Sequence, residues 1–494
     1  MKLKAKDMNI ATGDIRIVLL NHKDAHKIDL HPEDRIVLRK NGKIATAVVD
    51  IAESCKTVPL GSIGLFEEVL KDLGAKTGDF IDVTFQSKPE SIRHIKKKLD
   101  GHELNEIEIN SIVKDIVDNK LTDIEMTYFV SGIYTKGMTQ KETVALTKAM
   151  INSGSKLEIN KKQVFALHSI GGVSGNRTTM VVVPILIEAG LIVPKTASRA
   201  ITSSSGTADT MEVLCGVSWP ISKLKEFIER VGGFIVWGGA VKLAPADDRI
   251  INIEHPLSID PEQQMIASIM SKQGSISATH VLIEIPFGFG AKIDTKKKAE
   301  HLGKEFKKIG KELGMIVQFI LEDGSQPIGN GIGPGLECRD VIWALSNNVN
   351  APKDLIERSL EVAGKALEMT GHKNGRKLAA EILYSGRAYK KFFEIVVAQG
   401  GKIVKPDQLP LGKYSYTVKA PADCTVEHID NKSISRMARI AGAPKDLGAG
   451  VFIHKHVGEK ADKNEPLFTV YAETKQKLDY IVSNLEHLDG FTVR

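Results

Sequence analysis

The sequence is poor in several residue types, and each shortage excludes a class of protein. Its 494 residues include four cysteines, which lie far apart and form no C-x-x-C pair: Cys55, Cys215, Cys338 and Cys424. This spacing indicates neither a zinc ribbon nor a disulfide scaffold, so we expect buried thiols in a reducing compartment. Aromatic residues make up only 5% of the chain, so the stacking side chains expected of a nucleic-acid binder are lacking.

Long hydrophobic runs are also missing. The first twenty residues contain no continuous apolar stretch, and the run from Met180 to Val193 is interrupted by Pro184 and Glu188. These segments predict neither a signal peptide nor a membrane span. Lys and Arg exceed Asp and Glu by 67 to 61, a small surplus that anionic small-molecule substrates explain well. We therefore expect a cytoplasmic protein that binds neither nucleic acid nor a membrane.

What is present describes a globular protein of several domains, because 42% of the residues are hydrophobic and 26% are charged. Residues 1–86 alternate apolar and polar positions around a Lys40-Asn41-Gly42 turn, which predicts a small β-rich, barrel-like module. Residues 87–160 have helical spacing, with Ile109, Ile112 and Ile116 on one buried face. Residues 161–410 alternate strand-like and helical runs, which predicts an α/β sheet domain, and residues 411–494 indicate a C-terminal α+β domain. The fold class is therefore multidomain α/β.

The most informative stretch is 167–212, where two clusters of Gly, Ser and Thr flank an apolar segment and each cluster carries an arginine, Arg177 or Arg199. The apolar segment, Met180–Ile192, predicts a buried element packed between the clusters. Glycine lets backbone N–H groups approach a ligand closely, and hydroxyl groups add further donors, so the pattern favours an anion site. The segment GGVSG is not a P-loop, because Asn176 stands where that motif needs Lys. It also lacks the G-x-G-x-x-G spacing of a dinucleotide fingerprint.

Ordered motifs between Ile92 and Gly329 resemble the thymidine and pyrimidine nucleoside phosphorylase family. After a helical start at Ile92 they are HSIGGV at 168–173, GTADTME at 206–212, LAPAD at 243–247, ASIMSK at 267–272 and SQPIG at 325–329. The resemblance implies a helical domain and an α/β domain separated by a cleft, with phosphate bound on the α/β side. It also implies phosphorolysis, in which phosphate attacks C1′ of a ribosyl group and the base departs.

The chain departs from the pyrimidine enzymes at three places. Leu167 replaces the Lys that precedes their His-Ser pair, 251–256 offers no Arg, and 197–203 gains hydroxyl groups and loses glycines. Together with the additional N-terminal module, these departures are closer to the AMP phosphorylase branch of the family, known from archaea. That branch implies AMP and phosphate as substrates, adenine and ribose 1,5-bisphosphate as products, and CMP and UMP as further substrates. It also implies a homo-oligomer built on dimers, with no cofactor and no metal.

The resemblance assigns roles to residues of this chain that match the family motifs. Ser169, Thr179 and Thr207 would contact phosphate, while Ser268 and Lys272 would face the sugar or base. In the AMP branch the nucleotide would be bound by Gly172, Ser198, Arg199, Ala200, Ile201, Thr202, Ser203, Thr207, Ser268 and Lys292. Arg199 would pair with a phosphate. His168 would either orient the phosphate or serve as a structural hydrogen-bonding group.

Asp260 is the candidate general acid. An adenine anion leaves poorly unless it is protonated, so a carboxyl kept protonated by burial at the base would lower the barrier. The alternative is that Asp260 caps a helix in which Pro261 takes the first position, a role that favours the ionised form. Asp209 and Glu212 raise a similar question, and we expect them to stabilise a helix N-terminus rather than to hold a metal.

Three other functions compete with nucleotide phosphorolysis. Thymidine or pyrimidine nucleoside phosphorolysis is the first. A phosphoribosyltransferase of the related fold would depend on a divalent metal held by paired carboxylates, for which Asp247-Asp248 and Glu322-Asp323 are the adjacent acidic pairs. A non-catalytic nucleotide sensor would bind AMP without turnover.

Overall fold

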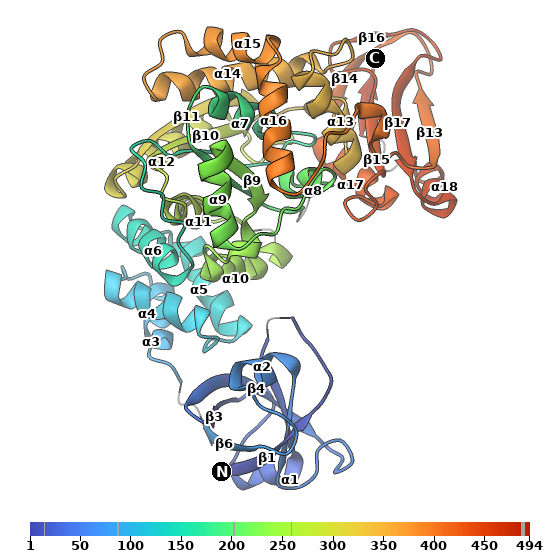
Figure 1. Cartoon of the computed structure of the whole chain (residues 1–494). Helices are drawn as coiled ribbons and strands as arrows, with labels where there is room; N and C mark the ends of the chain where they lie inside the picture. Colours follow the sequence, from blue (N-terminus) through green and yellow to red (C-terminus); the bar gives the residue numbers. More distant parts are fainter. Residues whose placement is uncertain (14, 86–87, 201–202, 258, 486–489) are drawn as a thin grey trace. The chain divides into compact units, whose positions relative to one another are not determined.

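The computed structural model describes residues 1–13, 15–85, 88–200, 203–257, 259–485 and 490–494. The chain divides into two compact units. The first comprises Met1–Ser153 with Pro245–Ala267, and the second comprises Gly154–Ala244 with Ser268–Arg494. Figure 1 colours the elements by sequence position, from the blue N-terminal strands to the red C-terminal ones.

A closed six-stranded barrel opens the first unit, in the strand order β1-β5-β2-β4-β3-β6. The barrel closes because β1 pairs with both β5 and β6. Asn41 and Gly42 both have positive φ, 48° and 79°, which is the geometry of the predicted hairpin turn between β3 and β4. The elements are β1 Lys2–Asp7, β2 Ile17–Asn21, α1 His22–Lys27, β3 Arg35–Lys40, β4 Lys43–Ala52, β5 Ser62–Leu65, α2 Glu67–Leu73 and β6 Phe80–Phe85.

Helices make up the rest of the first unit. Asn105 with Glu108 and Thr122 with Glu125 form capping boxes that begin α4 and α5. The predicted face of α4 is confirmed, since Ile109, Ile112 and Ile116 are fully buried. The helices are α3 Ser91–Leu99, α4 Glu106–Val117, α5 Asp123–Lys136, α6 Gln140–Ser153 and α10 Pro245–Glu254, followed by the short η2 His255–Leu257. Helix α11, Glu262–Ser275, begins in the first unit and ends in the second.

Parallel strands form the centre of the second unit. Strand β10 lies between β11 and β7, and β8 pairs with β9. A parallel bridge between Val164 and Ile192 places β7 beside β8, so the order is β11-β10-β7-β8-β9. The strands are β7 Phe165–Ser169, β8 Val193–Ala197, β9 Gly233–Trp237, β10 His280–Phe287 and β11 Ile316–Asp323. All five run in one direction, so their carboxyl ends share one edge.

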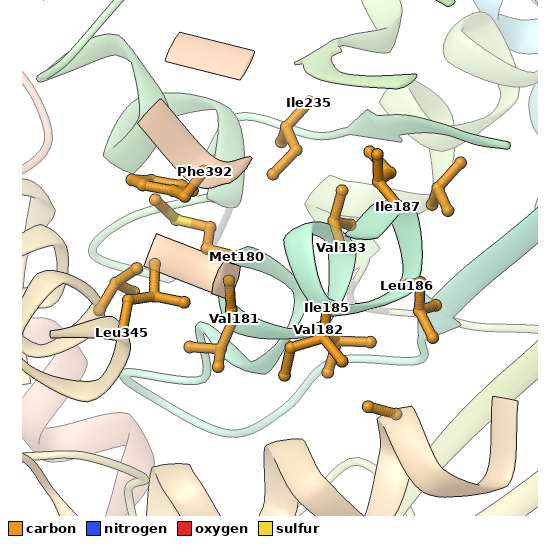
Figure 2. Packing of buried hydrophobic residues seen from close by; sticks show 14 of the residues in the cluster. Met180, Val181, Val182, Val183, Ile185, Leu186, Ile187, Ile235, Leu345 and Phe392 are labelled. Atoms are coloured by element: carbon orange, nitrogen blue, oxygen red, sulfur yellow. The ribbon is translucent and has the colours of Figure 1, made fainter. Parts of the chain in front are cut away.

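Helix α7, Thr178–Glu188, occupies the core of this unit. Every residue from Thr178 to Ile187 is buried, and Figure 2 shows its apolar side chains among Ile235, Leu345 and Phe392. The apolar run between the two hydroxyl-rich clusters is therefore the buried element that the sequence predicts. The other helices of this region are α8 Thr207–Glu212, α9 Ile221–Val231, α12 Lys296–Glu312, α13 Pro334–Leu345, α14 Lys353–Met369, α15 Gly375–Tyr384 and α16 Arg387–Ala398, with the short η1 Gly238–Val241 and η3 Pro406–Gln408.

Two small antiparallel sheets and two helices form the C-terminal region, coloured orange to red in Figure 1. One sheet has the order β12-β15-β17-β13 and the other β16-β14-β18. Strand β12, Gly331–Ile332, precedes α13 in the chain, yet it pairs with β15. The remaining elements are β13 Tyr414–Lys419, β14 Cys424–Ile429, α17 Asn431–Ala441, β15 Gly450–Ile453, β16 Lys460–Ala461, β17 Pro466–Ala472, α18 Lys475–Ser483 and β18 Phe491–Val493. The expected multidomain α/β fold class is confirmed.

Within the described ranges, no helix has the length and apolar character needed to cross a membrane.

Candidate functional site

Three loops leave the carboxyl ends of neighbouring parallel strands. One follows β7 and contains the glycines at 171, 172 and 175, the second follows β8 and contains 198–200, and the third follows β10 and contains Lys292. In open α/β sheets, ligands bind at this edge. The structure thus gathers most of the predicted phosphate and nucleotide residues in the second unit, on loops that the sheet holds side by side.

The first loop has the backbone shape of an anion cradle. Gly171 and Gly172 have φ values of 84° and 91°, and Gly171 N–H donates to Ser169 Oγ at 3.3 Å. Successive N–H groups in such conformations form concave anion sites. A Cβ atom at Gly172 would lie 2.8 Å from Lys292 N, so this glycine brings the first and third loops into contact. Thr179, buried in the first turn of α7, follows the same loop.

The second loop folds back on the start of α8. Asp209 Oδ2 accepts from Gly206 N at 2.8 Å and from Ala200 N at 2.7 Å, and Ser203 Oγ donates to Ser205 O at 3.0 Å. Asp209 therefore stabilises the helix N-terminus as expected, whereas Glu212 is the last residue of α8, so that part of the expectation was wrong. Ser198 is exposed and Thr207 is half-buried. Ile201 and Thr202, two predicted nucleotide-binding residues, lie outside the described residues.

Both arginines of the clusters are held by carboxylates. The buried Arg177 Nε lies 2.6 Å from Glu337 Oε2, and its Nη2 donates to Ser205 O at 2.7 Å, so it ties the first loop to the second. Arg199 pairs with Asp209 at 3.1 Å and with Glu212, and its guanidinium lies 4.9 Å from the centre of the Trp237 ring. Glu212 raises the pKa of Arg199. Its pairing with a substrate phosphate stays a prediction.

Three lysines supply positive charge around His168. Burial lowers the pKa of His168 well below its usual value, and the ammonium groups of Lys195, Lys272 and Lys292 act in the same direction. The half-buried imidazole is therefore neutral at neutral pH. Gln273 Nε2 lies 3.5 Å from His168 Nδ1, which is a distant hydrogen bond and leaves both predicted roles of His168 open.

Lys195 is the cation that the sequence prediction missed. It lies on β8, its relative exposure is only 9%, and its Nζ donates to Leu167 O at 2.9 Å. Burial lowers the pKa of this ammonium to about 8, against the attraction of Glu284. A lysine within the apolar segment IVPKTA was a visible signal, because lysine is almost never buried without a partner.

Acidic groups lie buried beneath the same edge of the sheet. Glu284 on β10 stands beside Ser169 in the strand register, and neither of its carboxylate oxygens accepts a hydrogen bond from the described residues. Burial raises its pKa. Burial and Glu284 together raise the pKa of Glu322 to about 8, while Arg358 Nη1, 3.2 Å from Glu322, opposes the shift. Lys195 and Arg358 oppose these shifts, but burial is the larger cause at both carboxyl groups.

The remaining candidates lie on or next to α11. Lys272 Nζ is 3.5 Å from the buried Ser268 Oγ, so these two predicted residues are neighbours on one helix face. Asp260 belongs to the first unit and is exposed, so the expected burial of its carboxyl is wrong. The predicted cap was also wrong by one residue, because Met265 N donates to Pro261 O at 2.9 Å and α11 begins at Glu262. No group of three or more potential metal-ligating side chains occurs within the described ranges.

Comparison with known proteins identifies relatives along nearly the whole chain. Residues 92–154 match the glycosyl transferase family helical bundle domain, and residues 425–488 match the pyrimidine nucleoside phosphorylase C-terminal domain. AMP phosphorylase 1 of Archaeoglobus fulgidus is 45% identical over 94% of this chain and 92% of its own length. AMP phosphorylase of Thermococcus kodakarensis is 43% identical over 98% of this chain and 96% of its own length. AMP phosphorylase of Methanocaldococcus jannaschii is 40% identical over 97% of this chain and 94% of its own length.

Solved structures share the fold of about three fifths of the chain. Anthranilate phosphoribosyltransferase from Thermus thermophilus covers 62% of this chain and 99% of its own, with a TM-score of 0.53 and 16% identity. The enzyme from Saccharomyces cerevisiae, in complex with PRPP and Mg, covers 63% of this chain and 98% of its own, with a TM-score of 0.52 and 13% identity. At this identity the likeness concerns the fold alone.

Proposed function

This chain belongs to the AMP phosphorylase family, and on that premise we propose that it cleaves AMP with inorganic phosphate, giving adenine and ribose 1,5-bisphosphate. The observation that carries the proposal is identity of 40 to 45% to AMP phosphorylases over nearly the full length of both chains. The family membership also makes it a pentosyltransferase. The pyrimidine nucleoside alternative is supported by a family match over residues 425–488, and the phosphoribosyltransferase alternative by structures of 13 and 16% identity.

The geometry of the second unit suits a reaction between two anions. A glycine cradle with Ser169 and Thr179 offers neutral donors, while Lys195, Lys272 and Lys292 surround the neutral His168 with positive charge. We assign the countercharge for the substrate phosphates to these lysines, because their ammonium groups act on His168, which directly precedes Ser169 and the glycine loop. Orienting a phosphate dianion with fixed donors lowers the entropic and electrostatic parts of the barrier.

In the proposed reaction, one oxygen of inorganic phosphate attacks C1′ of AMP as the bond from C1′ to the base nitrogen breaks. The bonding electrons leave with adenine, which takes up one proton, and the ribose keeps its 5′-phosphate. We assign that proton to Asp260. Its carboxyl is exposed and therefore accessible to a bound base.

Base release from AMP, thymidine and adenosine, each with and without phosphate and with a chelator, tests this function. Adenine release from AMP that requires phosphate and continues in the chelator is expected. Turnover of thymidine alone would favour the pyrimidine nucleoside branch, and loss of activity on chelation would favour metal-dependent phosphoribosyl transfer. Binding of AMP without turnover would favour the nucleotide sensor.

Several finer assignments belong to the same proposal. CMP and UMP are further substrates, the protein works in the cytoplasm, and it assembles as a homo-oligomer built on dimers. A monomer in light scattering would contradict the last of these. We also keep the division into segments 1–86, 87–160, 161–410 and 411–494 as a working description of its domains.

A further inference from the structure

One buried asparagine of the C-terminal region holds the loop that forms the anion cradle. Asn431 is the first residue of α17 and is 3% exposed. Its Oδ1 accepts from Ser174 N at 2.9 Å, and its backbone carbonyl accepts from Ser174 Oγ at 2.8 Å. Ser174 lies between Gly172 and Gly175, in the middle of the loop, so the first residue of α17 is hydrogen-bonded directly to this loop.

The same side chain reaches a second loop. Asn431 Nδ2 donates to Gly324 O at 3.0 Å, just after the end of β11. Ile328 N donates to Ser174 O at 3.0 Å, which adds a backbone link between the two loops. One planar amide thus supplies the acceptor for the glycine loop and the donor for the 324 loop, a combination that neither a carboxylate nor an apolar side chain offers.

A separate contact joins the C-terminal region to the third loop of the site. The ring of Phe289 packs edge-on against His428 of β14 with ring centres 5.0 Å apart. Phe289 lies three residues before Lys292, whose backbone is the close neighbour of Gly172. The C-terminal region therefore touches both loops that meet at Gly172.

We propose that Asn431 is a positioning residue for the bound phosphate, acting through Ser174, and that this is a role of the C-terminal region in catalysis. The inference rests on the proposed function. Glycines at 171, 172 and 175 make the loop conformationally free, and a loop that must present N–H groups to an anion works best when it is fixed beforehand. Two hydrogen bonds from Ser174 to the buried Asn431 provide that fixation, and a third, from Asn431 Nδ2 to Gly324 O, ties the same side chain to the neighbouring loop.

The test uses Asn431→Ala and Asn431→Leu in the full-length chain. Leu fills the volume of the asparagine without its hydrogen bonds or any new charge, so it serves if Ala fails to fold. The control is Asn484→Ala in the same region, since Asn484 follows α18 directly and its Nδ2 donates to Tyr480 O of that helix at 2.8 Å. KM and kcat are measured with AMP and phosphate varied separately, alongside urea unfolding followed by tryptophan fluorescence.

We expect KM for phosphate to rise by on the order of tenfold or more in both Asn431 variants. Each variant loses the two side-chain hydrogen bonds, to Ser174 N and to Gly324 O, and losing even one hydrogen bond to a buried group is worth about tenfold. KM for AMP should change less, and the control should match wild type. Wild-type KM for phosphate in a folded Asn431→Leu enzyme would overturn the proposal, as would a drop in activity that only follows the unfolding midpoint. If the unsubstituted protein fails to release adenine from AMP, the proposed function itself fails.

Discussion

Replacing Lys195 with Met should make the protein more stable and less active. Lys195 is 9% exposed, and burial lowers its pKa from 10.5 to about 8. At 1.36 kcal/mol per pKa unit, holding the ammonium in the fold costs ~3 kcal/mol at pH 7. A Met side chain is unbranched like that of Lys and carries no charge, but it cannot make the hydrogen bond to Leu167 O, which is worth ~1 kcal/mol. Burial raises the pKa of Glu284, the carboxyl that attracts Lys195, and so favours its neutral form, which leaves no buried charge unpaired when Lys195 is replaced. The net expected gain is therefore about 2 kcal/mol.

The pH dependence of this gain has a definite sign. Below pH 8 the lysine is charged in both the folded and the unfolded chain, so its full cost is present. As the pH rises from 8 to 10.5 the folded protein releases the proton first, and the cost falls to ~1 kcal/mol at pH 9.5. The stability difference between Lys195→Met and wild type should therefore shrink in alkaline buffer.

Tryptophan fluorescence is the suitable assay, because Trp219, Trp237 and Trp343 all lie in the second unit, which contains Lys195. Urea unfolding at pH 7 and 9.5 gives the free energy, and kcat/KM for phosphate should fall about 10- to 100-fold for the loss of a charge-assisted contact. Lys304→Met on the exposed side of α12 is the control. A Lys195→Met protein that is less stable, or that keeps full activity, would refute this reasoning.

Three further predictions concern the site. Gly172→Ala should lower kcat/KM about 100-fold, since its Cβ would meet the backbone of Lys292. The control is Gly190→Ala, because Gly190 has a similar φ of 94° but open space around it, and equal losses in both variants would count against a role for the loop. Asp260→Asn should lower kcat by at least ~100-fold without changing the unfolding midpoint, whereas Asp248→Asn, another exposed acid of the first unit, should not. Dialysis against EDTA should leave activity unchanged, and restoration of lost activity by Mg²⁺ would contradict the metal-free mechanism.

Local patterns were enough to predict much of the fold. The spacing of Ile109, Ile112 and Ile116 identified the buried face of α4, and the Asn41-Gly42 pair identified the hairpin. These features depend on residues close together in sequence, so periodicity and turn chemistry reveal them. The apolar run between the two hydroxyl-rich clusters was predicted as a buried element from its composition, and the structure shows that this element is a helix.

Long-range pairing could not be predicted from such patterns. The sequence shows two arginines in anion-binding clusters, but it does not show that Glu337, 160 residues away, holds Arg177. Nor does it show that Asn431 reaches back 257 residues to Ser174. Lys195 had a local signal in its apolar neighbours, yet its contact with Leu167 depends on the pairing of β7 with β8. These contacts follow from the order of strands in the sheet.

The most direct test of the account is to incubate the purified protein with AMP and phosphate and to quantify adenine and the sugar product together. The account predicts equal amounts of adenine and ribose 1,5-bisphosphate, and none of either without phosphate. Adenine release at the same rate without phosphate, or with ribose 5-phosphate as the sugar product, would mean hydrolysis and would contradict the phosphorolytic site described above.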